Sequence, residues 1–305
     1  MKNFNRRDFL HTSLTATAGM AVSVVGAETI SASSVTNDNG HFPMRLSVLS
    51  YSFRGLLDKG MIDIFGYLET CKYRYNLNIA DIWNGFLVTM DEGYLKKVRE
   101  AIDEREMMLT DLCADNVHIW DNDPAIRQKN YEYALANLRT AEILGARFMR
   151  LDAGGNGTEW TGEQFDHIVK RYKEYAQWAH DHGFMVGAEN HWGPEAVWAN
   201  MQKLYHAVEH PAFGVSCHIG GWHGTQAEKD EADRLAAPWV RHTHFPWNIT
   251  EGPLEEKMKN LRDAGYQGSY SVEHHSGKNE YAEVAIQLDR VRAVFDLWRT
   301  TDPKS

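Results

Sequence analysis

Residues 163–191 read EQFDHIVKRYKEYAQWAHDHGFMVGAENH and contain a helical pattern followed directly by a strand pattern. Apolar residues recur at a spacing of three or four, as one face of an amphipathic helix requires: Phe165, Ile168, Tyr172, Tyr175 and Trp178. Gly183 marks the end of this predicted helix, because glycine readily takes the left-handed conformation in which many helices end. The short apolar run Met185–Glu189 then has the length and composition of a strand.

The same strand-then-helix unit recurs along the chain from Arg45 onward. The predicted strands are Leu46–Ser50, Ile79–Trp83, Leu109–Cys113, Phe148–Asp152, Met185–Glu189, Gly214–His218, Val240–His244 and Ser269–Glu273. Gly145 and Gly265 end helices in the same way as Gly183. Eight β-then-α units without a long linker predict a single-domain α/β fold, a (β/α)8 TIM barrel over residues 41–305.

An open, doubly wound parallel sheet is the alternative fold for such a pattern. That fold requires a glycine-rich phosphate turn after its first strand. The corresponding turn here is Tyr51-Ser52-Phe53-Arg54-Gly55, which lacks that pattern. The closed barrel is therefore the preferred prediction.

The first 40 residues have the organisation of an export signal. Asn5-Arg6-Arg7-Asp8-Phe9-Leu10 resembles the twin-arginine motif of bacterial signal peptides. A weakly apolar stretch, Thr12–Gly26, follows it, and a spacer rich in Ser, Thr and Asn runs to about Gly40. Residues 1–40 are therefore predicted to be a signal peptide and spacer, and the mature protein to be periplasmic or otherwise exported. The pattern fits cleavage near Ala27 or near Ala32.

Composition excludes several classes of partner. The net charge of −10, from 32 Lys and Arg against 42 Asp and Glu, disfavours nucleic-acid binding, which depends on cations that neutralise phosphates. An apolar run of about 18 residues, as a membrane-spanning helix needs, is not found in the sequence. Cys71, Cys113 and Cys217 are odd in number and widely spaced, which predicts buried free thiols. The oligomeric state is left open.

Four consecutive predicted strands end in a carboxylate or an imidazole: Glu189, His218, His244 and Glu273. The active sites of such barrels lie at the carboxyl ends of the strands. Because alternate residues of a strand share a face, all four side chains are predicted to point inward at the same height. Two carboxylates and two imidazoles suit one Mn²⁺, Co²⁺, Fe²⁺ or Zn²⁺ ion better than Ca²⁺. We expect these four residues to bind a single divalent metal ion.

Other polar and aromatic residues are predicted to surround this group. Six tryptophans follow successive strands, at positions where they could contact the apolar faces of a sugar: Trp83, Trp120, Trp160, Trp192, Trp222 and Trp247. The predicted substrate contacts are His118, Trp120, Asp152, His191, Trp222 and Trp247, although each could also be a structural residue. His242 is predicted to orient a metal ligand from outside the coordination shell. Cations are scarce on the predicted loops, so an unphosphorylated carbohydrate is expected.

Several of these residues carry a family resemblance. Glu189-Asn190-His191, His242-Thr243-His244 and Glu273 resemble motifs of the xylose-isomerase-like barrel, a family of sugar isomerases and epimerases that includes inosose dehydratases and endonuclease IV. The resemblance runs from about Leu46 to the end of the chain. It implies that Glu189 and Glu273 both bind the metal and transfer protons.

The chain also departs from the family pattern at two strands. His218 and Gly221 stand where the sixth strand usually has Asp and, three residues later, His. Pro246-Trp247 replaces the usual Lys-Asp after His244. The first change removes one negative charge from the predicted site, and both affect residues near the substrate. They bear on the substrate and the reaction more than on the fold.

The sequence therefore predicts a metal-dependent isomerase or epimerase that removes a proton next to a sugar carbonyl. A lyase, dehydratase or hydratase acting on a keto-sugar, of the 3-keto-glycoside or inosose type, shares that first step and stays open. A non-catalytic carbohydrate-binding barrel would explain the tryptophans but not a convergent metal site. Endonuclease activity would require additional ligands from the early strands and a basic face.

Overall fold

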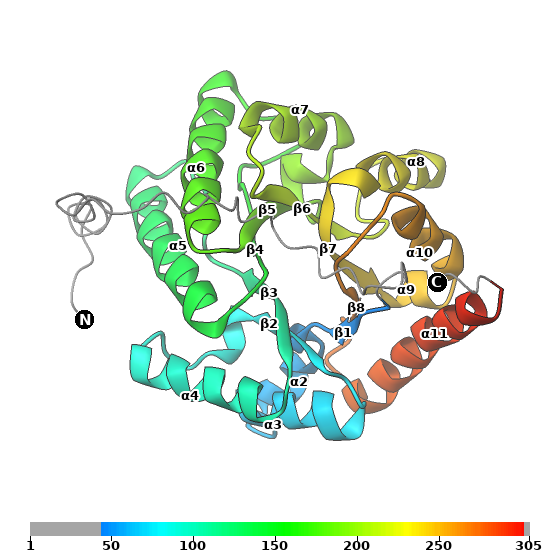
Figure 1. The fold of residues 1–305 in the computed structure, drawn as a ribbon. Helices are drawn as coiled ribbons and strands as arrows, with labels where there is room; N and C mark the ends of the chain where they lie inside the picture. Colours follow the sequence, from blue (N-terminus) through cyan, green and yellow to red (C-terminus); the bar gives the residue numbers. More distant parts are fainter. Residues whose placement is uncertain (1–43, 302–305) are drawn as a thin grey trace, which may run out of the picture. The chain divides into compact units, whose positions relative to one another are not determined.

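The strands of the computed structural model, which describes residues 44–301, form one parallel sheet that curves into a barrel (Figure 1). They are β1 Leu46–Val48, β2 Ile79–Trp83, β3 Met108–Ala114, β4 Phe148–Leu151, β5 Met185–Glu189, β6 Phe213–His218, β7 Val240–Pro246 and β8 Tyr270–Glu273. The predicted TIM barrel is confirmed. The predicted bounds of β2 and β5 are those observed, and β7 extends two residues further, through Pro246.

Helices follow the strands and surround the barrel (Figure 1). They are α2 Arg54–Asp58, α3 Ile64–Glu69, α4 Glu92–Glu104, α5 Pro124–Leu144, α6 Gly162–Asp181, α7 Trp198–Val208, α8 Gln226–Ala236, α9 Trp247–Thr250, α10 Leu254–Asp263 and α11 Glu280–Thr301. A capping box between Thr161 and Gln164 starts α6. Gly145 ends α5 in the left-handed conformation, with φ of 68°, as predicted from its position.

The barrel is closed between β1 and β2 by a different kind of contact. The hydrogen-bonded sheet runs from β1 through β8 to β2, and an isolated parallel bridge joins Leu49 to Asp81. The Tyr67 hydroxyl lies 2.8 Å from the carbonyl oxygens of both Val48 and Asp81, and it accepts the backbone N–H of Asp81 at 2.9 Å. A side chain of α3 thus satisfies backbone groups at this seam, which burial would otherwise leave unpaired.

The strands pack their apolar residues against the helices. Val186, Ala188, Val215, Cys217 and Val272 are completely buried, which agrees with the predicted alternation along β5, β6 and β8. The three cysteines are free and buried, as the sequence predicts. The alternation leaves the intervening positions of these strands, polar or glycine, for the barrel interior.

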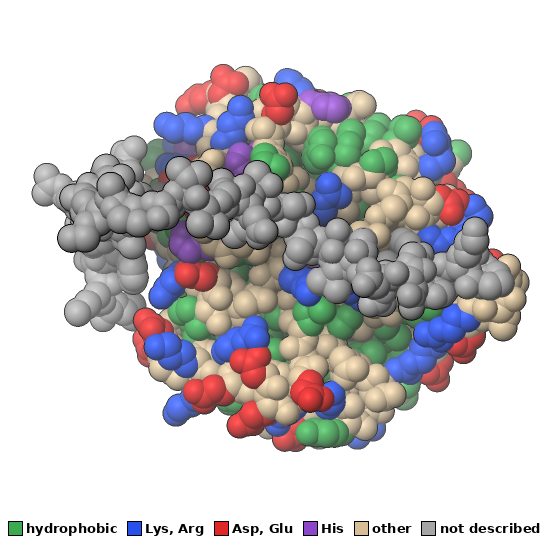
Figure 2. All heavy atoms as spheres, viewed as in Figure 1, with side chains coloured by type: hydrophobic (Ala, Val, Ile, Leu, Met, Phe, Trp, Pro, Cys, Tyr) green, Lys and Arg blue, Asp and Glu red, His purple; other side chains and the backbone are tan. Residues whose placement is uncertain are grey.

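Two surface properties bear on possible partners. Within residues 44–301, no helix combines the length and hydropathy that crossing a membrane requires. Figure 2 shows Lys and Arg side chains interspersed with Asp and Glu around the rim of the visible face. The predicted signal peptide and spacer, residues 1–40, lies outside the described residues.

Candidate active site

Glu189, His218, His244 and Glu273 converge at the carboxyl ends of β5 to β8. The His244 Nδ1 atom lies 2.7 Å from Glu189 Oε1, and the His218 Nδ1 atom lies 3.3 Å from Glu273 Oε2 and 3.7 Å from Glu189 Oε1. In the ladder His218 stands beside His244, but Glu189 stands beside Ser216. The four side chains meet in spite of these unequal register positions, because neighbouring strands of a barrel are staggered.

This group has the composition and burial of a metal site. Glu189, His218 and His244 each offer a ligand atom within 4.8 Å of the others, and so do His218, Glu273 and His275. The Oε2 atom of Glu273 is buried and has no hydrogen-bond partner. A mixed set of carboxylate oxygens and imidazole nitrogens is typical of sites for Zn²⁺ and related divalent ions. The residues present therefore fit a divalent cation.

Both glutamates are ionised at neutral pH. Burial alone would raise the pKa of Glu189, but the neighbouring charges of His244 and Arg150 outweigh burial and hold this pKa well below its usual range. Burial likewise opposes ionisation of Glu273, but the hydrogen bond from His275 contributes to lowering its pKa to about 2. A carboxylate is the form that coordinates a cation. Burial alone would lower the pKa values of His218 and His244, but the neighbouring glutamates raise both. Metal binding at this group would therefore release protons from the imidazoles.

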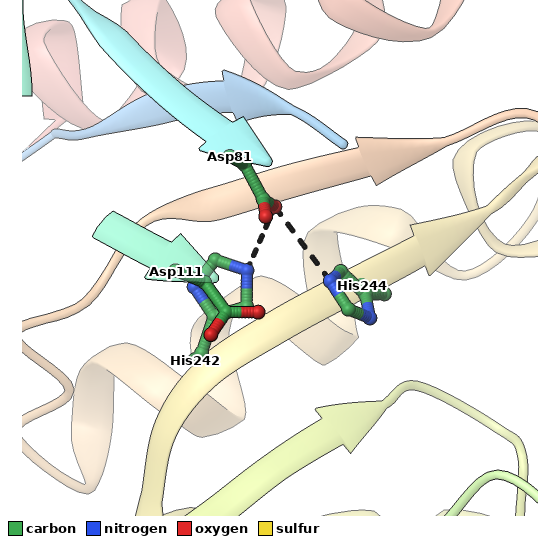
Figure 3. Close-up of side chains that lie close together, drawn as sticks. All are labelled: Asp81, Asp111, His242 and His244. Carbon is green, nitrogen blue, oxygen red and sulfur yellow. Dashed lines mark hydrogen bonds and ion pairs between the residues drawn. The ribbon is translucent and has the colours of Figure 1, made fainter. Parts of the chain in front are cut away.

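Asp81 of β2 lies beneath this group and was not identified from the sequence. Its Oδ2 atom lies 2.8 Å from His242 Nε2 and 3.6 Å from His244 Nε2 (Figure 3). His244 directs its Nδ1 atom to Glu189 and its Nε2 atom to Asp81. In a metal-binding histidine, the ring nitrogen that does not bind the metal usually faces a carboxylate or carbonyl oxygen. His242 therefore contacts Asp81, and Asp81 in turn faces His244, which is one of the predicted metal ligands. In the sequence, Asp81 could have been recognised as a charged residue within the otherwise apolar run Ile79–Trp83.

We expect Asp81→Asn to weaken metal binding by about 10- to 100-fold, because the amide removes the negative charge that faces His244 Nε2 at 3.6 Å. Isothermal titration with Co²⁺ or Zn²⁺ would measure the affinity. Asp111→Asn is the comparison variant. Asp111 is equally buried and belongs to the same cluster as Asp81, His242 and His244 (Figure 3), but its Oδ1 atom accepts the backbone N–H of Arg150. Equal losses in the two variants would contradict a specific role for Asp81.

Arg150 of β4 is the second residue that sequence reasoning missed. Its guanidinium is 3% exposed, and its Nε atom lies 3.0 Å from Glu189 Oε2. The same group contacts Asp152 Oδ2 and Asp115 Oδ1, each at 2.8 Å. Arg150 therefore holds the carboxylate oxygen of Glu189 that faces away from His244. In the sequence, Arg150 could have been recognised as a charged residue within the otherwise apolar strand Phe148–Leu151.

Two predicted substrate contacts lie beside Glu189. The Asp152 side chain is buried, and burial raises its pKa in spite of the neighbouring charge of Arg150. His191 Nδ1 lies 3.8 Å from Glu189 Oε2, and its side chain is 42% exposed. His118 is partly buried on the loop after β3, with its ring 4.6 Å from that of Trp192. Asp152 and His191 are thus near the candidate metal ligands, whereas His118 contacts an aromatic side chain.

The three predicted tryptophan contacts have different surroundings. Trp222 is 1% exposed and donates its indole N–H to Asp233 at 2.9 Å, so the structure places it in the core. Trp120 is 8% exposed and lies under the guanidinium of Arg127, 4.3 Å from the ring centroid. Trp247 is 37% exposed at the start of α9. Position after a strand therefore does not by itself bring a tryptophan to the site.

Comparison with solved structures gives the same fold at low sequence identity. The 3-keto-D-glucoside 4-epimerase from E. coli is 14% identical, with a TM-score of 0.65, and the match covers 82% of this chain and 100% of that chain. The probable 3-DHS dehydratase from Bacillus anthracis is 14% identical, with a TM-score of 0.63, over 83% of this chain and 99% of that chain.

A third structure, also similar in fold, contains a metal ion. The xylose isomerase-like TIM barrel protein from Mycobacterium smegmatis, in complex with magnesium, is 12% identical, with a TM-score of 0.66, over 84% of this chain and 97% of that chain. A search of curated proteins gives no match. The family model described as xylose isomerase-like TIM barrel matches residues 74–293, which is more than half of the chain. The chain therefore belongs to the xylose isomerase-like TIM barrel family.

Proposed function

We propose that this protein is a divalent-metal-dependent isomerase or epimerase that removes a proton next to the carbonyl of an unphosphorylated sugar. The observation that carries the proposal is the convergence of Glu189, His218, His244 and Glu273 at the carboxyl ends of four adjacent strands. Catalytic residues of TIM barrels lie at that end. The epimerase and dehydratase of similar fold support the same class of chemistry.

The proposed chemistry begins with proton abstraction. Glu189, His218, His244 and Glu273 would hold the cation, which when bound supplies Lewis-acid polarisation of a carbonyl oxygen. Glu273 takes the proton from the neighbouring carbon, and the electron pair of the C–H bond moves toward the carbonyl oxygen. Glu189 is the second carboxylate available for proton transfer. Return of the proton to the opposite face gives an epimer, and its return to the adjacent carbon gives an isomer.

A lyase or dehydratase acting on a keto-sugar is the second candidate. Proton abstraction is common to both reactions, and loss of a substituent from the next carbon would complete an elimination. The observation that favours it is the similar fold of the probable 3-DHS dehydratase. The side-chain geometry at Glu189 and Glu273 serves either outcome.

The preference for an unphosphorylated substrate rests on the surroundings of the described cations near the site. Arg54 donates to the carbonyl oxygen of His274 at 3.1 Å and lies over the ring of Tyr51. Arg127 lies over the ring of Trp120. Arg150 is buried among carboxylates. These three arginines already have partners, and Lys278 is exposed on the loop after β8. A phosphate is normally held by Arg or Lys side chains and backbone amides that are free to donate.

The test is ¹H NMR of the purified protein in D₂O with added Mn²⁺, Co²⁺, Fe²⁺ or Zn²⁺. The substrates are neutral aldoses and ketoses, 3-keto-glycosides and matched phosphate esters. We expect exchange of the proton next to the carbonyl in a neutral sugar or keto-sugar, its loss on addition of a chelator, and a kcat/KM at least about tenfold lower for the phosphate ester. Exchange that is insensitive to chelation would contradict the metal requirement. Preference for the ester would contradict the substrate class.

We also propose that residues 1–40 direct export by the twin-arginine route and that residues 41–305 form the exported enzyme. The support is the motif around Arg6 and Arg7 and the spacer that follows it. A fusion of residues 1–40 to a reporter should reach the periplasm, and changing both arginines to lysine should block it. A reporter that crosses equally well without the arginine pair would refute this route.

A further inference from the structure

Two half-exposed histidines flank His218 at the mouth of the barrel. The His191 and His275 side chains are 42% and 43% exposed, and each ring centroid lies 5.6 Å from that of His218. Each imidazole also faces one glutamate of the candidate site, Glu189 for His191 and Glu273 for His275. The two histidines are therefore a matched pair in exposure and position.

The surroundings of the two glutamates distinguish this pair. On the His191 side, Arg150 Nε lies 3.0 Å from Glu189 Oε2, closer than the 3.8 Å to His191 Nδ1. The positive guanidinium at that oxygen disfavours a cation between Glu189 Oε2 and His191, and leaves Glu189 Oε1 available to the site. On the His275 side, the His275 Nε2 atom lies 3.2 Å from Glu273 Oε1. The ion pairs of Arg150 are with Glu189, Asp152 and Asp115 instead.

His275 also lies within reach of a shared cation. His218, Glu273 and His275 offer ligand atoms that all lie within 4.8 Å of one another. Asp152, Glu189 and His191 form a similar group on the other side, but there Arg150 contacts both carboxylates. The Oε2 atom of Glu273, on a side chain that is 7% exposed, is buried without a hydrogen-bond partner and faces His218 at 3.3 Å. An unpartnered carboxylate oxygen beside an imidazole, on a carboxylate whose other oxygen faces His275, is an atom that coordination would satisfy.

We propose that His275 is an additional metal ligand, which makes the site rich in imidazole and selective for Zn²⁺, Co²⁺ or Fe²⁺ over Mg²⁺. The inference rests on the proposed metal-dependent function and specifies its cofactor. With His218 and His244, the donor set becomes three imidazoles and two carboxylates. Imidazole nitrogen suits Zn²⁺, Co²⁺ and Fe²⁺, whereas Mg²⁺ prefers oxygen donors and retains bound water.

The competing role for His275 is a hydrogen bond to Glu273 without coordination. His275→Gln separates the two, because a glutamine amide can still donate to the carboxylate but is a poor ligand for these ions. His275→Ala removes both functions. His191→Gln and His191→Ala are the matched controls at an equally exposed histidine on the other side of His218. Thermal unfolding without metal would establish that all four variants are folded.

The experiment is a titration of the purified full chain with Co²⁺, followed by visible absorption, and by competition with Zn²⁺ and Mg²⁺. We expect both His275 variants to bind Co²⁺ about tenfold or more weakly and to shift its visible absorption band. The His191 variants should keep the affinity within about twofold and leave the band unchanged, because no ligand is lost. The wild type should bind Zn²⁺ at least about a hundredfold more tightly than Mg²⁺.

Each other outcome would overturn a defined part of the inference. A His275→Gln variant with the wild-type affinity and spectrum would show that His275 only hydrogen-bonds to Glu273. Equal losses of Co²⁺ affinity in the His191 and His275 variants would show that changing either exposed histidine beside His218 weakens binding, without loss of a specific ligand. Comparable affinities for Zn²⁺ and Mg²⁺ would contradict the selectivity. A wild-type chain that binds none of these ions would remove the proposed metal-dependent function as well, whereas the first three outcomes leave that function standing.

Discussion

The Glu273→Gln variant is expected to lose catalytic proton exchange by about 10²- to 10⁴-fold, the usual contribution of a general base. Glutamine preserves the size of the side chain and one oxygen donor but cannot accept the proton. Metal binding should weaken yet persist, since Glu189, His218 and His244 remain in contact with one another. The residue therefore contributes more to the chemical step than to the affinity for the cation.

The measurement is deuterium wash-in next to the carbonyl, followed by ¹H NMR at saturating Co²⁺ or Zn²⁺. This reports the first step whether the final reaction is isomerisation, epimerisation or elimination. Metal content must be determined on the same samples, so that loss of the ion is not mistaken for loss of the base. A metal-loaded variant that exchanges at the wild-type rate would eliminate Glu273 as the base and transfer the role to Glu189 or a nearby histidine.

The Arg150→Met variant is expected to lose about 3–5 kcal/mol of unfolding free energy, the typical cost of removing one partner of a buried ion pair. Arg150 is 3% exposed and contacts Glu189, Asp152 and Asp115 at 2.8–3.0 Å. Methionine fills much of the same volume but leaves Asp152 buried without its guanidinium partner, whereas Glu189 keeps His244 at 2.7 Å. Urea unfolding of the metal-free protein, followed by circular dichroism, would measure the loss.

The loss should also depend on pH. Burial already raises the pKa of Asp152, and Arg150 opposes that shift. Without the guanidinium, the folded variant would bind a proton at Asp152 more readily than the unfolded chain does. Because its folded state then binds more protons, the stability of the variant should rise as the pH falls from neutral, and the difference from the wild type should narrow.

Two further variants control for changes unrelated to the buried cluster. Arg139→Met removes the partner of Glu142 from an exposed pair on α5 and should change stability little. Arg150→Lys retains a cation but cannot reproduce the several directed contacts of a guanidinium, so an intermediate loss is expected. An Arg150→Met protein as stable as Arg139→Met would show that the buried carboxylates do not depend on Arg150.

The sequence by itself determined the barrel and the four residues at its carboxyl end. Both follow from local periodicity: helices show a spacing of three or four, and strands alternate inside and outside. In a closed parallel sheet, that alternation is enough to turn Glu189, His218, His244 and Glu273 toward a common interior. The observed strand bounds and contacts agree with this reasoning.

Only the tertiary structure decided which other side chains meet these four residues. Asp81 lies 161 positions from His242 in the sequence, and Arg150 on β4 reaches Glu189 on β5. Trp222 follows a strand, as Trp120 and Trp247 do, yet it packs in the core against Asp233. Periodicity fixes the face of an element on which a residue lies. Which side chain it meets depends on barrel stagger and loop path, and these are set by packing across the whole molecule.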